Sequence, residues 1–273
     1  MNTQAQEAVL YSAAGGVAQI TLNRPDRLNA SNRALSQGLT AAFTRAAVDP
    51  QVRVVLLAGA GRAFCAGADL QVLDEISAGP DAAHSGSNGL RYDGITRLEK
   101  PVVAAIRGAC AGIGLALACA ADIRIAAEDA VFVAPFVKLG LPAEGGLAWL
   151  LSHAMGPGNA AELLLSARRM GAGEALAKGL VAHVLPVEGF GSAMLAYAQD
   201  LASGAPASFA AIKKQIFQAA THDFATAQDH AATLALTMLQ GHDFREAVAA
   251  RREGRVPAFA PIAGRFDPPV SEG

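Results

Sequence analysis

The spacing of hydrophobic and polar positions changes along the chain, and each spacing predicts an element. The apolar runs at 52–57, interrupted only by Arg53, and at 101–106 are rich in β-branched residues, which is typical of strands buried on both faces. Apolar positions at helical spacing predict an amphipathic helix over 29–48, with Ser31 or Asn32 as its cap. The first part of the chain therefore alternates between strands and helices.

The same patterns place the remaining elements. Further strands are expected at 8–11, 17–22, 123–125, 131–132 and 181–184. Further helices are expected at 68–76, 189–202, 209–220, 224–239 and 243–252. Because only helices follow residue 187, the pattern predicts an α/β core over 1–202 and a helical C-terminal region over 203–273. The Gly-, Pro- and Ser-rich stretch 77–93 is expected to be a mobile loop.

Composition and charge exclude several classes of protein. The 273 residues are 52% hydrophobic with a net charge of −2, which argues against a nucleic-acid binder. The uncharged stretch 108–121 is too short for a membrane span, which needs ~20 apolar residues. Three cysteines without metal-site spacing indicate free thiols. With no signal-peptide pattern at its start and no peroxisomal address at its end, the protein is expected to be cytoplasmic.

Common motifs for cofactors, metals and nucleophiles are absent from the sequence. Gly59 and Gly61 begin like a dinucleotide-binding fingerprint, but Phe64 occupies the third glycine position. No phosphate-binding loop, zinc-binding HExxH or GxSxG nucleophile elbow is present. Cys65 has no basic partner close in sequence and is interpreted as a packing residue. We therefore expect no metal and no bound cofactor.

Two predicted strand-to-helix turns, 64–69 and 110–114, are the strongest candidates for chemistry. Glycines before a buried helix leave backbone N–H groups free at the helix start, where partial positive charge gathers. Two such N–H groups directed at one point would form an oxyanion hole, each contributing about 3 kcal/mol in a transition state. The alternative is that Gly112 and Gly114 serve only packing.

Three motifs resemble a known family. ITLNRPDRLNA (20–30), GAGRAFCAGADL (59–70) and KPVVAAIRGACAGIGLALACAADIRIA (100–126) are similar to the crotonase, or enoyl-CoA hydratase/isomerase, superfamily in order and spacing. The similarity covers residues 7–259. It implies a spiral of ββα units, C-terminal helices that make trimer contacts, and an acyl-CoA substrate. A dimer of trimers would fit equally.

The resemblance also implies site residues. The thioester carbonyl would be held by the backbone N–H groups of Ala68 and Ile113. The CoA path would be lined by Arg27, Ala66, Asp69, Leu70 and Phe259.

The sequence departs from the hydratases of this family at both catalytic glutamates, which are replaced by Ala116 and Phe136. Glu144 remains, in a GLPAEGG loop that is similar to the peroxisomal type of 3,2-enoyl-CoA isomerases. Burial beside Leu141, Leu147 and Trp149 would favour its protonated form near neutral pH, which suits a proton shuttle. The alternative is an exposed loop carboxylate near a helix N-terminus.

Three functions remain open. The first is isomerisation of a 3-enoyl-CoA to a 2-enoyl-CoA by Glu144. The second is a hydratase or other acyl-CoA lyase or hydrolase that pairs Glu144 with Asp74, Glu75 or a residue of the 77–93 loop, such as His84. The third is a CoA-thioester-binding protein without catalysis. Asp122 is interpreted as a structural acid, and Trp149 as a cavity wall or core residue.

Overall fold

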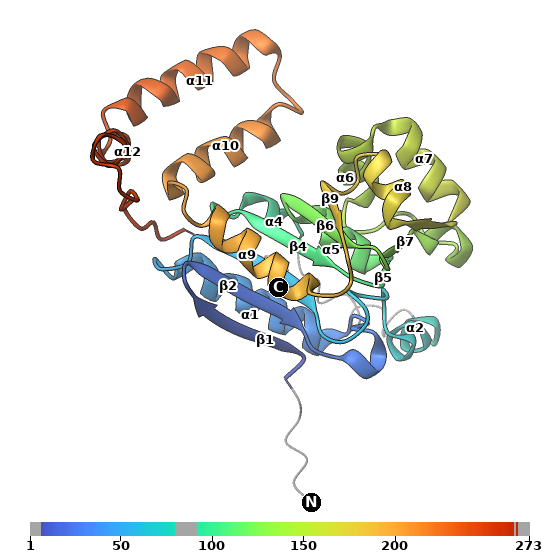
Figure 1. Ribbon diagram of the computed structural model, residues 1–273. Helices are drawn as coiled ribbons and strands as arrows, with labels where there is room; N and C mark the ends of the chain where they lie inside the picture. Colours follow the sequence, from blue (N-terminus) through green and yellow to red (C-terminus); the bar gives the residue numbers. More distant parts are fainter. Residues whose placement is uncertain (1–6, 80–91, 265, 267–273) are drawn as a thin grey trace, which may run out of the picture.

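The computed structural model describes residues 7–79, 92–264 and 266, and has the expected α/β architecture. Within these residues, six strands form one sheet in the order β1-β2-β3-β4-β6-β9, and three form a smaller sheet, β5-β7-β8 (Figure 1). The strands are β1 (Val9–Ala14), β2 (Val17–Leu22), β3 (Val54–Gly59), β4 (Val102–Ile106), β5 (Ala109–Ala111), β6 (Ile123–Ala127), β7 (Val131–Val133), β8 (Arg169–Gly171) and β9 (His183–Leu185).

The large sheet is parallel from β2 to β9, and β1 joins it as one half of an antiparallel hairpin. Parallel strands are covered on both faces, and β3 shows how. Val55 and Leu57 belong to one core beneath α1 (Arg33–Val48), whereas Val54 and Leu56 belong to a second core beneath α9 (Phe190–Leu201). The two helices lie on opposite faces of the sheet (Figure 1). The continuous apolar run in the sequence follows from this double burial.

The small sheet turns the strands into successive ββα units. β4 continues into β5, and β6 continues into β7, before helices follow. β5 and β7 are the second strands of two successive units, and they pair with each other in parallel in the small sheet. The strands β5 and β8 were not predicted, because their sequences, ACA and RMG, lack the β-branched and aromatic residues that mark a strand.

The helices fall into a core group and a C-terminal group. The core group is α1, α2 (Leu70–Ser77), α4 (Tyr92–Arg97), α5 (Ile113–Ala120), α6 (Leu147–Met155), α7 (Pro157–Ser166), α8 (Ala172–Ala177) and α9, with the 3-10 turns η1 (Pro25–Arg27) and η2 (Pro135–Leu139). The C-terminal group is α10 (Pro206–Gln218), α11 (Phe224–Leu239) and α12 (His242–Glu253). Figure 1 shows this second group extending away from the sheets.

Most predicted elements are confirmed, with shifted ends. The helix expected over 29–48 begins at Arg33, with the Asn32 side chain accepting a hydrogen bond from Leu35 N–H at 3.0 Å. The helix expected from residue 209 begins earlier, at Pro206. Most of the loop expected over 77–93 lies outside the described residues. In the described residues, none of the helices is long and apolar enough to cross a membrane.

Candidate active site

The two predicted strand-to-helix turns lie side by side. Cys65 and Cys110 form a parallel β-bridge, in which Cys65 N–H donates to Ala109 O at 3.0 Å and Ala111 N–H donates to Cys65 O at 2.9 Å. A β-carbon on Gly112 would stand 3.9 Å from the α-carbon of Gly67. The residues that precede Ala68 and Ile113 are therefore direct neighbours.

Glycine is required at position 114 because α5 begins against the first turn. A β-carbon on Gly114 would collide with the carbonyl oxygen of Cys65 and stand 2.9 Å from its sulfur atom. Such a contact is far shorter than van der Waals distance, so a side chain here would push the two turns apart. Gly112 has a φ of +51°, a conformation that side chains disfavour. These two glycines set the separation of the turns.

Both candidate amides lack a hydrogen-bond acceptor among the described residues. In the described part of the chain, neither Ala68 N–H nor Ile113 N–H donates a hydrogen bond. Ile113 is the first residue of α5, where the N–H groups have no partner within the helix and the helix dipole is positive. Both residues are half-buried. Such a pair of donors is suited to holding negative charge on an oxygen atom.

Asp69 is tied into the protein by its carboxylate. It is 4% exposed and pairs with Arg24 at 2.6 Å, while Arg24 also donates to the carbonyl of Ala30. Burial acts to raise the pKa of Asp69, but hydrogen bonds from Arg24 and from Gln71 N–H outweigh it, and the pKa is lowered. The carboxylate predicted to line the CoA path is thus occupied by an internal ion pair beside Ala68.

Asn29, which sequence reasoning missed, holds the same region from within. It is fully buried with a φ of +57°. Its amide donates to Ala60 O at 2.9 Å and Ala63 O at 2.8 Å, and its oxygen accepts from Arg24 N–H at 2.8 Å. An Asn in a turn is a recognisable signal, because Asn tolerates positive φ and can replace backbone partners.

The other residues predicted on the CoA path divide into two groups. Arg27 is exposed in η1, and the next residue, Leu28, accepts a hydrogen bond from Ala66 N–H at 3.0 Å. Leu70, 75% exposed, begins α2 directly after the first turn. Arg27, Ala66 and Leu70 are therefore brought together around this turn.

Phe259 lies elsewhere. Its carbonyl accepts a hydrogen bond from Arg53 at 3.2 Å, and Arg53 precedes the amino end of β3. The first turn follows the carboxyl end of the same strand, about 20 Å away for six residues at 3.3 Å each. Within one chain, Phe259 is not part of the site formed by the two turns.

The loop that carries Glu144 packs against α5, but the predicted burial of Glu144 is wrong. The side chain is exposed, and Leu141 and Trp149 are 41% and 45% exposed. Leu147 is fully buried, yet it points into the core as the first residue of α6. The desolvation on which the expected proton shuttle relied is therefore not provided by these neighbours within one chain.

Two contacts place the Glu144 loop near the second turn. A β-carbon on Gly145 would stand 2.6 Å from the ring of Tyr92 and 3.2 Å from the β-carbon of Ala116. Ala116 lies in α5, one turn after Ile113, and is fully buried. Phe136 is also buried, in η2. The Glu144 loop thus lies beside the helix whose first N–H is a candidate oxyanion donor, and buried apolar side chains occupy positions 116 and 136, where the resemblance predicts the glutamates of a hydratase.

The expectations for two further residues are confirmed. Burial raises the pKa of Cys65 to about 11, which keeps the thiol protonated and agrees with a packing role. Asp122 is a structural acid: it accepts hydrogen bonds from Val102 N–H and from Lys213, both at 2.7 Å. Lys213 was missed, because one lysine on an amphipathic helix has the same pattern whether it is exposed or buried.

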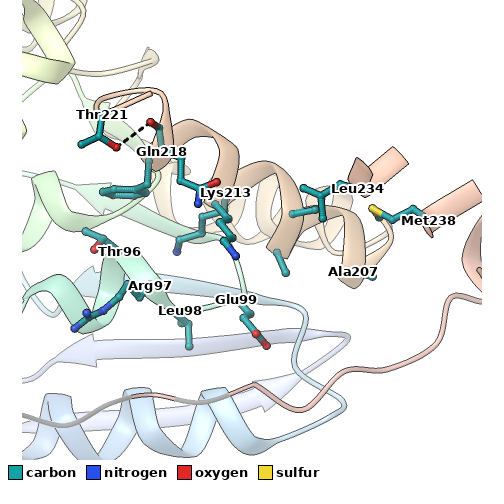
Figure 2. A pocket seen from close by; sticks show the side chains of 14 residues that line it. Thr96, Arg97, Leu98, Glu99, Ala207, Lys213, Gln218, Thr221, Leu234 and Met238 are labelled. Carbon is teal, nitrogen blue, oxygen red and sulfur yellow. Dashed lines mark hydrogen bonds between the residues drawn. The ribbon is translucent and has the colours of Figure 1, made fainter. Parts of the chain in front are cut away.

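A cavity of about 670 Å³ is lined by the end of α4 and by the C-terminal helices α10 and α11. Figure 2 shows Lys213 of α10 on one side, Leu234 and Met238 of α11 at one end, and Thr96 to Glu99 opposite. A smaller groove of about 270 Å³ adjoins it and is lined by Tyr92, Gly145, Trp149 and Phe217, among others. The apolar surface near Glu144 therefore continues toward the C-terminal helices.

Comparison with known proteins agrees with this geometry. The family model for enoyl-CoA hydratase/isomerase matches residues 12–261. A Rhodobacter capsulatus protein named "Probable enoyl-CoA hydratase" is 37% identical, covering 92% of this chain and 97% of its own. The human mitochondrial Delta(3,5)-Delta(2,4)-dienoyl-CoA isomerase is 34% identical, covering 93% and 79%.

The fold comparison gives the same result. The crystal structure of enoyl-CoA hydratase from Bacillus anthracis superposes with a TM-score of 0.87 at 30% identity, covering 93% of this chain and 99% of that one. The spiral of ββα units followed by C-terminal helices is thus the crotonase fold. The chain belongs to the enoyl-CoA hydratase/isomerase family.

Proposed function

We propose that this acyl-CoA enzyme isomerises a 3-enoyl-CoA to the trans-2-enoyl-CoA with Glu144 as its single acid–base group. The observation that carries the proposal is the contact of Gly145 with Ala116, which brings the Glu144 loop against α5 close to the free N–H of Ile113. Neither hydratase glutamate position holds a carboxylate, because these positions are Ala116 and Phe136. One carboxylate is sufficient for a proton transfer between two carbons.

The proposed reaction moves one proton and one double bond. Glu144 accepts the proton from C2, and the C–H electrons form a dienolate whose oxygen receives hydrogen bonds from the N–H groups of Ala68 and Ile113. The protonated Glu144 then returns the proton to C4, which leaves the double bond between C2 and C3. Glu144 ends as the carboxylate, and the reaction needs no cofactor.

A second candidate is hydration, or another lyase or hydrolase reaction on an acyl-CoA. The relative named as an enoyl-CoA hydratase favours it, whereas the relative named as a dienoyl-CoA isomerase favours isomerisation. Hydration needs a group that activates water in addition to one that manages the α-proton. A CoA-thioester-binding protein without catalysis is the third candidate, motivated by Ala116 and Phe136.

The chain is also proposed to act as a homotrimer or a dimer of trimers. Support comes from α11, in which none of the residues is buried within one chain, and from its exposed Phe224 and Leu236. A subunit placed there could also cover Glu144.

The test is a paired assay with trans-3-hexenoyl-CoA and crotonyl-CoA, in which the absorbance of the conjugated thioester is followed. We expect a rise with the first substrate, and a fall in kcat of about 10³-fold in Glu144→Gln, because removal of an acid–base group costs roughly 10²–10⁴. The control is Glu188→Gln, an exposed glutamate before α9, which should retain full activity. Hydration of crotonyl-CoA, or full activity in Glu144→Gln, would contradict the proposal.

A further inference from the structure

Tyr92 is the aromatic side chain that meets the Glu144 loop. It is the first residue of α4, and its ring edge lies against Gly145 so closely that a β-carbon there would be 2.6 Å from Cε2 and 2.7 Å from Cδ2. A β-carbon at the same place on Gly145 would also stand 3.2 Å from the β-carbon of Ala116. Tyr92, Gly145 and Ala116 thus meet where a hydratase of this family carries its first glutamate.

The hydroxyl of Tyr92 has no hydrogen-bond partner in the described part of the chain. Tyr92 is half-buried and lines a groove together with Gly145, so an acceptor on the Glu144 loop can approach its hydroxyl in the working state of the protein. Glu144 is the residue before Gly145, and its charge acts on this hydroxyl. A carboxylate is the strongest acceptor that the loop can supply.

The protonation of Tyr92 limits what it can do. Burial is the main cause that raises the pKa of Tyr92, and the negative charge of Glu144 adds to it. Cys65 is neutral near pH 7, because burial raises the pKa of its thiol to about 11. The phenol therefore keeps its proton near neutral pH, so it can donate a hydrogen bond but cannot act as a base.

We infer that Tyr92 is a positioning residue for Glu144: its ring fixes the loop at Gly145, and its hydroxyl donates a hydrogen bond to the Glu144 carboxylate when substrate is bound. This inference rests on the proposed function. It makes Tyr92 the polar group that partly compensates for the absence of a glutamate at position 116. The hydrogen bond stabilises the ionised form of Glu144, the form that accepts the C2 proton.

The experiment compares Tyr92→Phe with the wild type, because this substitution keeps the ring against Gly145 and removes only the hydroxyl. With trans-3-hexenoyl-CoA we expect kcat to fall about tenfold, KM to stay within about twofold, and the acid limb of the kcat–pH profile to move to higher pH. The shift follows because a carboxylate without this donor is protonated more readily. Exchange of the α-proton of hexanoyl-CoA in deuterated water should slow by a similar factor.

The matched control is Tyr11→Phe. Among the described residues, the Tyr11 hydroxyl also lacks a partner, but its ring lies under Arg45 at 4.2 Å, in the first hairpin. Tyr11→Phe should leave kcat and the pH profile unchanged. The double variant Glu144→Gln with Tyr92→Phe should be no slower than Glu144→Gln alone, because a residue that acts through Glu144 has no effect once the carboxylate is gone.

Two outcomes would overturn the inference. One is a Tyr92→Phe variant with wild-type kcat and pH profile in an enzyme that Glu144→Gln disables; the isomerase proposal would then stand without Tyr92. The other is a further loss in the double variant, which would mean that Tyr92 acts independently of Glu144. If Glu144→Gln itself changes neither turnover nor exchange, the proposed function fails, and the inference fails with it.

Discussion

The two strand-to-helix turns and the C-terminal helix α11 differ in how much of their surface is buried within the chain. Cys65, Cys110 and Leu115 around the turns are at most 1% exposed, and the turns are hydrogen-bonded directly to each other. α11 has none of its residues buried in the chain, and Phe224 at its start is 81% exposed. The candidate oxyanion donors are thus positioned by packing within one chain. In the part of the chain that the structure describes, α11 has no such packing, so its apolar side chains stay exposed within one chain.

The C-terminal group is attached to the core through buried charge. Lys213 of α10 donates to Asp122 at 2.7 Å and to the carbonyls of Ile95 and Lys100 at 3.1 and 3.2 Å. Burial raises the pKa of Asp122, and Lys213 opposes this effect. A polar anchor of this kind fixes where a helix sits without requiring a large apolar contact.

The largest expected effect comes from breaking the tight packing of the turns with Gly114→Ala. The added methyl group meets the Cys65 carbonyl, which is backbone and cannot move cheaply, so the N–H of Ile113 is displaced. We expect kcat to fall at least about 100-fold and the free energy of unfolding to fall by about 1–3 kcal/mol, measured by steady-state kinetics and urea unfolding. Gly158→Ala is the control: no atom lies within 4 Å of its β-carbon in α7. Wild-type activity in Gly114→Ala would refute the rigid positioning.

An intermediate effect is expected from Lys213→Met, which removes the anchor and leaves Asp122 buried without its cation. We expect a loss of about 3 kcal/mol in the free energy of unfolding at pH 8, since breaking a buried pair costs roughly 3–5 kcal/mol. The loss should be smaller at pH 5. In the variant, the folded-state pKa of Asp122 is raised further above the unfolded value, so stability is lost as pH rises through it. Lys214→Met, at an exposed neighbour, should change stability by less than about 0.5 kcal/mol. An equal loss at both pH values would argue against an uncompensated Asp122.

The smallest effect on the chain itself is expected from Phe224→Ser. Because this side chain is 81% exposed, the free energy of unfolding of the isolated chain should change by less than about 0.5 kcal/mol. The molecular mass by light scattering should instead shift toward the monomer if α11 makes the proposed trimer contacts. Leu165→Ser is the control, because Leu165 is 74% exposed but lies on α7. A change of mass in the control alone would place the subunit contact on the core.

The elements with long periodic patterns were predictable from the sequence. The helix over Phe224–Leu239 was expected with the same bounds, and the β-branched runs of β3 and β4 marked buried strands. The three-residue strands β5 and β8 were not, because their pairing with β7 joins residues far apart in sequence, and only the folded chain reveals it. Pattern alone reports local preference, not long-range partners.

The positions of the two turns of the candidate site were predictable from the sequence, but the side chains that surround Glu144 were not. Glycines at 112 and 114 marked the second turn, and resemblance to the family pointed to Ala68, Ile113 and Glu144. The burial of Glu144 was wrong, because the apolar residues on either side of it in sequence face the surface or the core rather than its carboxylate. Tyr92, 52 residues upstream, contacts the loop only through the packing of α4 on α5.

On the proposed mechanism, the charge on the substrate is held by main-chain N–H groups, and every residue except proline carries one. If the activity of every single substitution in the two strand-to-helix turns were measured, tolerance to substitution would not follow closeness to the substrate. Positions 68 and 113 would tolerate many replacements, although their atoms perform the work. Positions 65, 112 and 114 would tolerate few, although they touch no substrate. A genetic screen would identify the residues that hold the two turns together and would miss the two N–H donors. Only substitution by proline at 68 or 113, which removes the N–H group, would reveal the donors as a loss of activity.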